Sequence, residues 1–442
     1  MMTRYVLIGM GVAAISALES IRSVDDQGEI LVISDDPYGY YSRPGLAYYL
    51  TGELEEQLLF PYQKEDFLRL RARFIRGQVV KVYPEEKQAA LEDGTFIRYD
   101  KLLIATGAQA VPLRIPGADL HGVHKLDHLT DARAMLGNAR RGGTAIVTGG
   151  GITAVEIAEG LAARGMKVHY VMRSHRYWPS VLDEAESEIV ESLLARENIQ
   201  IYRKSELAEI VGRNGRVAGA RLADGRTLRA ELIAFAIGVT PRIALAQQIG
   251  LRCERGILVN ECMETSLADI YAAGDVAQVI DPASGKHLLD SLWGPALEQG
   301  RTAGLNMAGR KTPYQKPAAL NITRLAGLTV TIIGAVSLPS TPSDLKGEQD
   351  LLSIARGDSE TWRQLPDCII AQSGFDVNRL RLVIGEKHIL GAVVMGDQKL
   401  SASLQKIIHR KVEITSIREH LLAPHAPLAD VLVQFVHRTQ IS

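Results

Sequence analysis

The start of the sequence combines a short apolar run with three small residues at fixed spacing. The run is Tyr5-Val-Leu-Ile8, and Gly9, Gly11 and Ala14 come after it in the pattern G-x-G-x-x-A. The pattern predicts a buried strand, a tight turn, and a helix whose N-terminus faces a pyrophosphate. Ala14 would let that helix pack closely on the sheet. Glycine triplets also occur in ordinary turns, so the motif gains weight only from later segments of the chain.

Composition indicates a globular protein of two or three domains. The 442 residues are 46% hydrophobic and 23% charged, with a net charge of -1, so neither nucleic acid nor an anionic membrane is expected as the main partner. The sequence contains no apolar run of about 18 residues and no signal-peptide pattern, so we expect a cytoplasmic location. Three scattered cysteines, Cys253, Cys262 and Cys368, predict no disulfide framework and no metal or iron–sulfur site.

The segment after the loop is typical of a mononucleotide-binding unit. Residues 12–22 have helical periodicity, and residues 29–34 form a second apolar run that ends at Asp35. A carboxylate there is placed to accept hydrogen bonds from a ribose, although Asp-Asp-Pro is also typical of a surface turn. Arg43, followed by Pro44, could hold a phosphate through a bidentate contact.

Two later segments complete a pattern. Residues 99–108 run as a strand into Ala105, Thr106 and Gly107, and residues 270–277 form a short strand followed by Gly274 and Asp275. With the first loop, these segments resemble, in order and type, the pyridine nucleotide–disulfide oxidoreductases, which are two-dinucleotide-binding-domain flavoproteins. The resemblance spans residues 4 to 310.

The resemblance implies a fold and a first cofactor. It implies an α/β fold with two nested Rossmann-like domains: an FAD-binding domain (1–118 and 255–315), an NAD(P)H-binding domain (119–254), and a C-terminal α+β interface domain (316–442). It implies that FAD is held by Gly9, Gly11, Ala14, Asp35, Arg43, Pro44, Ala105, Thr106, Gly107, Gly274 and Asp275. Val80 stands where the family contacts adenine, with Val79 as the alternative.

A second glycine loop lies between the two later segments. Gly149, Gly151 and Ala154 repeat the small-residue spacing, and Gly165 is expected to end the helix after this loop. By the resemblance, this nested unit implies NADPH or NADH as electron donor, with Glu156 beside the nicotinamide and flavin and Gly238 passing the nicotinamide. The alternative for Glu156 is an ordinary exposed helix carboxylate.

The end of the next predicted strand bears on the choice of nucleotide. Relatives that prefer NADH carry a carboxylate there, whereas this chain has Met172, followed by Arg173, His175 and Arg176. Because arginines offer charge-assisted donors to a 2′-phosphate, we hypothesise an NADPH preference or tolerance of both nucleotides. The alternative is a basic, solvated loop.

The predicted route for electrons leaving the flavin does not use a thiol. The cysteines that serve disulfide reductases and peroxidases are missing from the first domain. The segment around Arg43, Pro44 and Leu46 resembles the branch of rubredoxin reductases, ferredoxin reductases and the flavin part of nitrite reductase, but Tyr48 replaces that branch's lysine. Tyr48 could donate a hydrogen bond at the flavin, or Tyr48 or Tyr49 could pack in the core. Trp293 is expected near the flavin or, equally, in the core.

The last third of the chain has the pattern of strands followed by a helix. Residues 328–334 and 379–384 are strand-like, 385–388 a hairpin turn, 389–395 a strand, and 400–409 a helix. Residues 337–360 look like a loop or insertion. The family's interface domain would dimerise or cover the flavin, so a homodimer is one expectation and a monomer the other.

These observations favour an FAD-dependent NAD(P)H oxidoreductase that passes electrons to a small iron–sulfur carrier of the rubredoxin or ferredoxin type. One alternative is an oxidase or diaphorase that reduces oxygen, quinone or another small molecule directly. Another is a flavoprotein subunit or redox-sensing scaffold. An arginine-rich stretch of the first domain could dock an acidic carrier or simply be a solvated face; its members are Arg43, Arg69, Arg71, Arg73 and Arg76.

Overall fold

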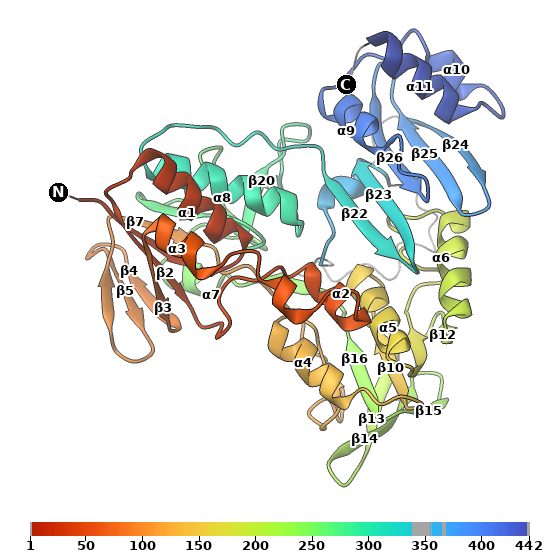
Figure 1. Cartoon of the computed structure of the whole chain (residues 1–442), viewed down its shortest axis with the longest axis horizontal. Coiled ribbons are helices and arrows are strands. Elements are labelled where there is room, and N and C mark those ends of the chain that lie inside the picture. The colour runs from red at the N-terminus through yellow and green to blue at the C-terminus, as the bar shows by residue number, and fades with distance from the viewer. Residues whose placement is uncertain (1, 338–353, 355, 365–367, 440–442) are drawn as a thin grey trace.

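The computed structural model describes residues 2–337, 354, 356–364 and 368–439 (Figure 1). Two five-stranded parallel sheets and one five-stranded antiparallel sheet organise this part of the chain. Most of the predicted insertion, residues 338–353, lies outside the described residues. The expected α/β fold class is confirmed.

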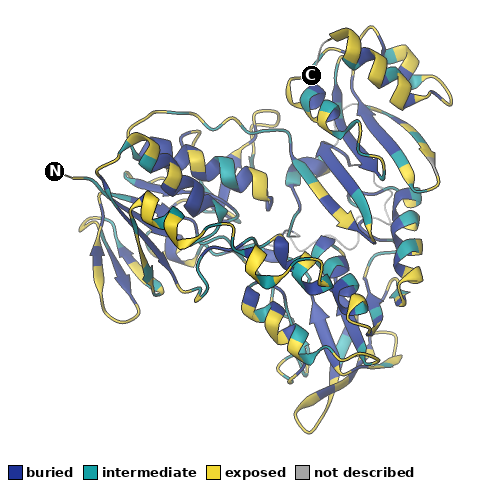
Figure 2. Cartoon of the chain, viewed as in Figure 1, coloured by how far each residue is buried: buried dark blue, intermediate teal, exposed yellow. Residues whose placement is uncertain are grey.

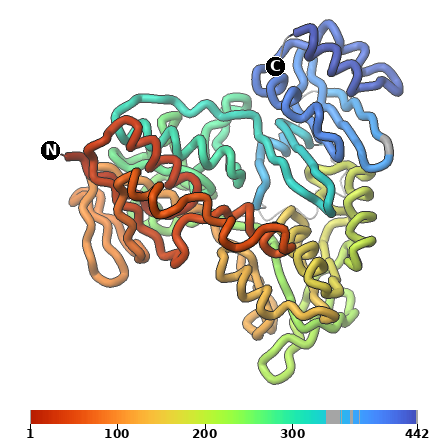
Figure 3. Tube along the Cα trace, viewed as in Figure 1, coloured from red at the N-terminus to blue at the C-terminus, as the bar shows by residue number. Residues whose placement is uncertain are grey.

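The first sheet has the order β19-β7-β1-β2-β3, with all strands parallel. Its strands are β1 (Arg4–Ile8), β2 (Glu29–Ser34), β3 (Ala72–Arg76), β7 (Lys101–Ile104) and β19 (Ile270–Ala272). The inner strands are apolar and buried because helices cover the sheet. Two of these, α1 (Val12–Val24) and α8 (Trp293–Met307), lie side by side although they are far apart in sequence (Figure 3).

The second sheet has the order β12-β11-β10-β16-β9 and is also parallel. Its strands are β9 (Val123–His124), β10 (Thr144–Thr148), β11 (Lys167–Val171), β12 (Ile199–Tyr202) and β16 (Leu232–Phe235), accompanied by α4 (Leu129–Asn138), α5 (Ile152–Ala163) and α6 (Glu184–Arg196). All of them fall between β7 and β19 in sequence, so the second unit is nested in the first as expected. Gly165, at φ +82°, comes after the end of α5 as predicted.

Smaller elements complete the two units. Where the chain passes between the two units, β8 (Ala108–Ala110) and β17 (Val239–Pro241) form an antiparallel pair. The remaining strands are β4 (Val79–Tyr83), β5 (Gln88–Leu91), β6 (Phe96–Arg98), β13 (Leu207–Arg213), β14 (Arg216–Leu222), β15 (Thr227–Arg229), β18 (Ile257–Leu258), β20 (Ala277–Ile280) and β21 (His287–Leu288). The short helices are α2 (Gly45–Thr51), η1 (Glu56–Leu59), α3 (Lys64–Leu70) and α7 (Ala244–Gln248).

The third sheet is antiparallel, in the order β22-β23-β26-β25-β24. It comprises β22 (Leu320–Leu325), β23 (Leu328–Gly334), β24 (Ile369–Phe375), β25 (Asn378–Ile384) and β26 (Ile389–Met395), followed by α9 (Ser401–His409), α10 (Arg418–Leu422) and α11 (Leu428–Thr439). A short helix, η3 (Glu360–Arg363), precedes β24. The predicted strands, hairpin turn and helix of this region are confirmed.

The third sheet is packed on the second unit, and this contact is buried (Figure 2). Val330 and Val393 share a core with Trp178 of the second unit. At its edge, the guanidinium of Arg381 donates to the carboxylate of Glu186 at 2.9 Å, and both side chains are fully buried. Arg381 also donates to the backbone oxygens of Val181 and Val336, so its charge is well satisfied.

Candidate functional site

The first glycine of each loop has a positive φ and lies against a backbone carbonyl. Gly9 has φ +112° and Gly149 has φ +151°, and both lie against a neighbouring chain segment. A Cβ at Gly9 would lie 2.1 Å from the carbonyl oxygen of Ala105, and one at Gly149 would lie 2.2 Å from that of Ala236. Because such contacts are shorter than any real Cβ tolerates, only glycine fits either turn.

Both loops present a helix N-terminus without a competing side chain. Gly11 and Gly151 are the N-cap residues of α1 and α5, and neither helix has a side-chain cap or an acidic residue in its first turn. Ala14 and Ala154 are fully buried against the sheets. The first backbone N–H groups of each helix are therefore free to donate hydrogen bonds to an anion, as recognition of a pyrophosphate requires.

The end of β2 carries two carboxylates with different surroundings. Asp35 is exposed, whereas Asp36 is half-buried and accepts hydrogen bonds from the backbone N–H of Tyr38 and the hydroxyl of Tyr41. Arg43 lies 3.6 Å from Asp36, and His128 lies 3.3 Å from it. Burial alone would raise the pKa of Asp36, but the His128 ring and these donors lower it.

His128 joins this cluster to the second unit, and sequence reasoning missed it. Its Nε2 lies 3.1 Å from the guanidinium of Arg242, at the end of the segment that contains Gly238. Arg242 is tied to the Ala-Thr-Gly segment, because its carbonyl accepts from Thr106 Oγ1 at 3.1 Å and its N–H donates to Gly107 O at 2.9 Å. The segments around Gly107 and Gly238 therefore lie against each other.

The Gly-Asp segment lies at the start of α8. The N–H of Gly274 donates to Gln299 Oε1 at 2.8 Å, and Ser291 Oγ donates to the carboxylate of Asp275 at 3.1 Å. Burial raises the pKa of Asp275, and the charge of Arg356 opposes that effect. Trp293, the first residue of α8, is 48% exposed, so its assignment to the core is wrong.

Three other predicted residues are also placed by the structure. Val80 is exposed on β4, whereas Val79 packs against the core of the first unit. Pro44 is the N-cap of α2. Tyr48, on that helix, is 39% exposed, so its core alternative is wrong; Tyr49 is partly buried, and its hydroxyl donates to Glu56 at 2.8 Å.

Glu156 lies on the first turns of α5 and is half-buried, not an ordinary exposed carboxylate. Burial raises its pKa to about 7, with a further contribution from Glu159 one turn later. Burial also raises the pKa of Glu159 to about 7. The helices that carry Tyr48 and Glu156, α2 and α5, pack against each other, with Leu50 next to Gly160. The pKa of Tyr48 is raised first by burial and next by the charge of Glu156.

The two arginines predicted to bind the nucleotide point in different directions in the loop after β11. Met172 is buried, and Arg173 is exposed beside it. Arg176 instead turns back toward its own loop, where its guanidinium lies 3.4 Å from the carbonyl oxygens of Leu182 and Pro179. Only Arg173 of the two therefore presents its side chain to solvent at the strand end.

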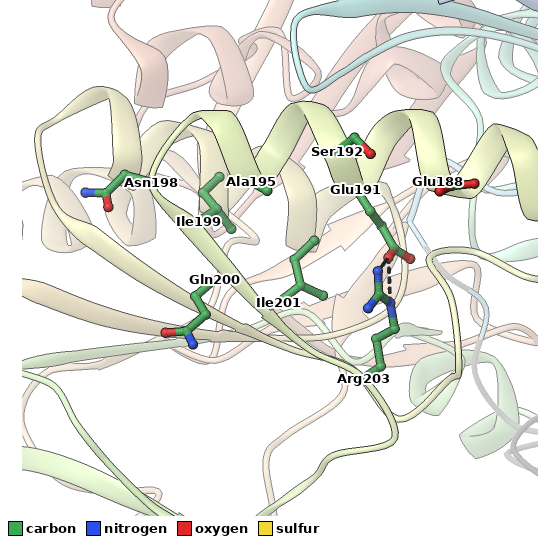
Figure 4. A pocket seen from close by; sticks show the side chains of 9 residues that line it. All are labelled: Glu188, Glu191, Ser192, Ala195, Asn198, Ile199, Gln200, Ile201 and Arg203. Carbon is green, nitrogen blue, oxygen red and sulfur yellow. Dashed lines mark hydrogen bonds and ion pairs between the residues drawn. The ribbon is translucent and has the colours of Figure 1, made fainter.

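An open cavity of about 500 Å³ lies between α6 and the edge strand β12 (Figure 4). There, the Nε of Arg203 donates to Glu191 at 2.6 Å. The other carboxylate oxygen of Glu191 accepts from the backbone N–H of Tyr177 at 2.7 Å. These contacts fix the far end of the loop that begins at Met172.

The arginine-rich stretch does not form one patch. Arg43 lies in the cluster with Asp36 and His128, whereas the others are exposed along α3 and β3. Arg69 pairs with Asp66, and Arg73 pairs with Glu29. The exposed part of the stretch is thus Arg69, Arg71, Arg73 and Arg76.

The cysteines lie on other elements. Cys253 and Cys262 fall between α7 and β19, and Cys368 immediately precedes β24. Within the described ranges, no group of three or more His, Cys, Asp or Glu residues is arranged to hold a metal ion. A helix of the length and apolarity needed to cross a membrane is likewise not found among the residues described.

Comparisons with known proteins agree with this geometry. The model of the family described as pyridine nucleotide-disulphide oxidoreductase matches residues 3–297. An NADH oxidase from Methanocaldococcus jannaschii is 31% identical over 353 residues, which is 78% of each chain. A rubredoxin-NAD(+) reductase from Pseudomonas putida is 29% identical over 75% of this chain and 86% of that one. A nitrite reductase [NAD(P)H] from Bacillus subtilis is 27% identical over 93% of this chain, which spans only 48% of that relative.

Solved structures share the fold. The covalent complex of putidaredoxin reductase with putidaredoxin matches with a TM-score of 0.84 at 20% identity, over 98% of each chain. An engineered water-forming NADPH oxidase bound to NADPH matches with a TM-score of 0.81 at 20% identity, over 99% of each chain.

Proposed function

The chain belongs to the pyridine nucleotide-disulphide oxidoreductase family, and on that basis we propose that it passes electrons from NAD(P)H through FAD to a small iron–sulfur carrier without a redox-active cysteine. Its activity as a flavin-dependent NAD(P)H oxidoreductase, with FAD and a nicotinamide nucleotide as cofactors, is confirmed by the family and the relatives. The observation that carries the proposal is the contact between the segments around Gly107 and Gly238, which brings the two glycine-loop units together at one junction.

The first unit fits FAD. The turn at Gly9 leaves no room for a side chain, and the N-terminus of α1 offers backbone donors. At Gly107, with φ +67°, a Cβ would meet no described atom within 4 Å, so backbone is open to a ligand there. We assign the pyrophosphate to Gly11 and Arg43, the adenosine ribose to Asp35, and the ribityl chain to Asp275.

The second unit would hold the nicotinamide nucleotide in the same way. Gly149 and Gly151 would receive its pyrophosphate, and Glu156 and Gly238 would lie near the nicotinamide. When bound, FAD would accept the hydride, and the protein would position the flavin and nicotinamide rings. Tyr48, near Glu156, would be a hydrogen-bond donor at the flavin edge.

The loop after β11 supports a preference for NADPH. Directly after β11 this chain has Met172, Arg173 and Ser174, so no acidic residue stands at the strand end to repel a 2′-phosphate. The exposed guanidinium of Arg173 is available to a 2′-phosphate.

The acceptor proposal rests on the relatives and on the placement of the cysteines. Relatives over most of this chain include a rubredoxin-NAD(+) reductase and a rhodocoxin reductase, and the putidaredoxin reductase fold match is a complex with its carrier. The elements that carry Cys253, Cys262 and Cys368 are not those that form the glycine-loop junction.

The test is carrier reduction by a thiol-free holoenzyme. The variant with all three cysteines replaced by alanine is expected to reduce a rubredoxin or a [2Fe–2S] ferredoxin at the wild-type rate with NADPH. A rate that falls at least tenfold while flavin reduction by NADPH stays normal would overturn the thiol-free route. A flavin that NADPH reduces and that no carrier reoxidises would overturn the carrier proposal.

A direct oxidase is the second candidate, because the NADH oxidase relative covers 78% of this chain. Oxygen consumption without a carrier distinguishes the two. If oxygen alone supports turnover as fast as a saturating carrier does, the oxidase is favoured.

Docking of an acidic carrier would use Arg69, Arg71, Arg73 and Arg76, and carrier-dependent turnover would then fall steeply with salt. Flat salt dependence would leave these residues as a solvated face. The cytoplasmic location and the homodimer stay predictions.

A further inference from the structure

A segment of the C-terminal region, residues 356–360, crosses the junction of the two nucleotide-binding units; we call it the strap. Just before it, Ile354 and Val239 of β17 exchange backbone hydrogen bonds at 2.8 and 3.1 Å. Within it, the N–H of Gly357 donates to Ser291 O, and the N–H of Ser291 donates to Asp358 O, both at 2.9 Å. The strap therefore joins the segment after Gly238 to the segment that precedes α8.

The strap is fixed at its far end to the first unit. Ser359 Oγ donates to the carboxylate of the buried Asp290, which also lies 3.3 Å from the ammonium of Lys316. Glu360 accepts from the backbone N–H of Leu289 at 2.9 Å. These charge-assisted contacts tie the strap to the first unit as well as to the C-terminal region to which it belongs.

The strap also touches the second unit at its glycine loop. A Cβ at Gly357 would lie 3.4 Å from Cδ1 of Ile152, the first residue of α5. The carbonyl of Gly357 accepts from Asn321 Nδ2 of β22 at 3.0 Å, so the third sheet holds the strap in this position. The strap thus lies over the N-terminus of the helix that carries Glu156.

The side chain of Arg356 pairs with one carboxylate, and its charge acts on two others. Its guanidinium pairs with Asp127, which is buried and also accepts from Lys125 at 2.9 Å and from the N–H of Ala110. The positive charge of Arg356 also opposes the rise that burial causes in the pKa of Asp275 and of Glu156. Asp127 and Glu156 belong to the second unit, and Asp275 belongs to the first.

We propose that Arg356, from the C-terminal region, places a positive charge at the flavin–nicotinamide junction. There it serves as counterion to Asp275 and Glu156 and to the negative charge of reduced flavin. The inference rests on the proposed function, because Asp275 and Glu156 are there assigned to FAD and nicotinamide. A cation in this partly buried place acts on its neighbours through a low effective dielectric, so it would matter more than a surface arginine.

The test is the flavin midpoint potential of the holoenzyme, measured with dithionite and reference dyes and therefore without NAD(P)H. Arg356→Met is expected to lower the potential, so that the equilibrium constant for flavin reduction falls about tenfold, whereas Arg356→Lys stays near the wild type. Arg410→Met, at an exposed position after α9, is the control for loss of a positive charge; its potential should not change. An unchanged potential in Arg356→Met would overturn the proposal.

Asp127→Asn provides a second measurement with the opposite sign, which does not depend on Arg356→Met being stable. Removal of the carboxylate that neutralises Arg356 is expected to raise the flavin potential. A lowered potential would contradict the proposed counterion role. If the wild-type potential is measurable but NAD(P)H does not reduce the flavin, the proposed function fails independently of the inference about Arg356.

Discussion

The two glycine-loop units have the same turn and differ in the residues after their second strand. Gly9 and Gly149 adopt the same kind of backbone and approach a neighbouring carbonyl oxygen at 2.1 and 2.2 Å, measured from an added Cβ. After β2 the chain continues with Asp35, whereas after β11 it continues with Met172 and Arg173. Under the proposed function, the shared turn would receive the pyrophosphate in both units, and the strand end would decide which ribose is accepted.

The units also differ in what supports them. In the first unit, α1 and α8 belong to the unit itself and pack on each other. The second unit is instead packed against the C-terminal region: Trp178 contacts Trp362 of η3, with ring centroids 5.8 Å apart, and Glu186 pairs with Arg381 of β25. The loop that would choose the nucleotide is therefore stabilised by the C-terminal region.

The largest effect is expected from Arg381→Met, which would take from the buried carboxylate of Glu186 its 2.9 Å ion pair and leave it the more distant Arg379, at 3.9 Å. We expect a loss of about 3–5 kcal/mol in the free energy of unfolding, measured with denaturant. Arg410→Met, at an exposed position after α9, should change it by less than about 0.5 kcal/mol. A loss below about 1 kcal/mol for Arg381→Met would show that the second unit stands without this contact.

Alanine substitutions at the first glycine of each loop should affect the binding of different cofactors. Gly9→Ala is expected to weaken FAD binding about 30-fold, and Gly149→Ala should retain FAD but weaken NAD(P)H binding by a similar factor. The expectation reflects about 2 kcal/mol of backbone strain and close contact at either turn. Flavin content and NADPH titration measure the two effects. Loss of FAD from both variants alike would break the distinction between the units.

Glu156→Gln tests the electrostatics of the second loop. Because the pKa of Glu156 in the folded protein is about 7, above its unfolded value, folding favours the protonated acid. The wild type should therefore lose stability as pH rises from about 5 to 8. Relative to it, Glu156→Gln should gain about 2 kcal/mol at pH 8 and little at pH 5. Glu188→Gln, exposed on α6, is the control; a difference independent of pH would contradict a shifted Glu156.

The smallest effect concerns the strand end. Arg173→Ala should weaken NADPH binding about tenfold, or ~1.4 kcal/mol, and leave NADH binding unchanged. Arg213→Ala, exposed on β13, should alter neither. Equal losses for both nucleotides would show that Arg173 does not read the 2′-phosphate.

Local patterns predicted much of this molecule, whereas contacts between distant segments did not emerge from them. The glycine loops, the strands that precede them and the β25–β26 hairpin each depend on residues close in sequence. Arg356 pairs with Asp127 at a separation of 229 residues, and Arg381 pairs with Glu186 at 195. A single sequence does not reveal such pairs, because an arginine has the same local signature whether it lies in solvent or in a buried ion pair. A histidine likewise has no local signature of its distant partners, so the contacts of His128 were not predicted.

Anaerobic titration of the yellow holoenzyme with NADPH and, separately, NADH tests the central claim most directly. We expect that one equivalent of NADPH bleaches the flavin, that NADH does so only at higher concentration, and that added rubredoxin or ferredoxin restores the colour. A flavin that neither nucleotide bleaches would contradict the oxidoreductase account and favour the scaffold. Tighter reduction by NADH than by NADPH would contradict the proposed role of Arg173.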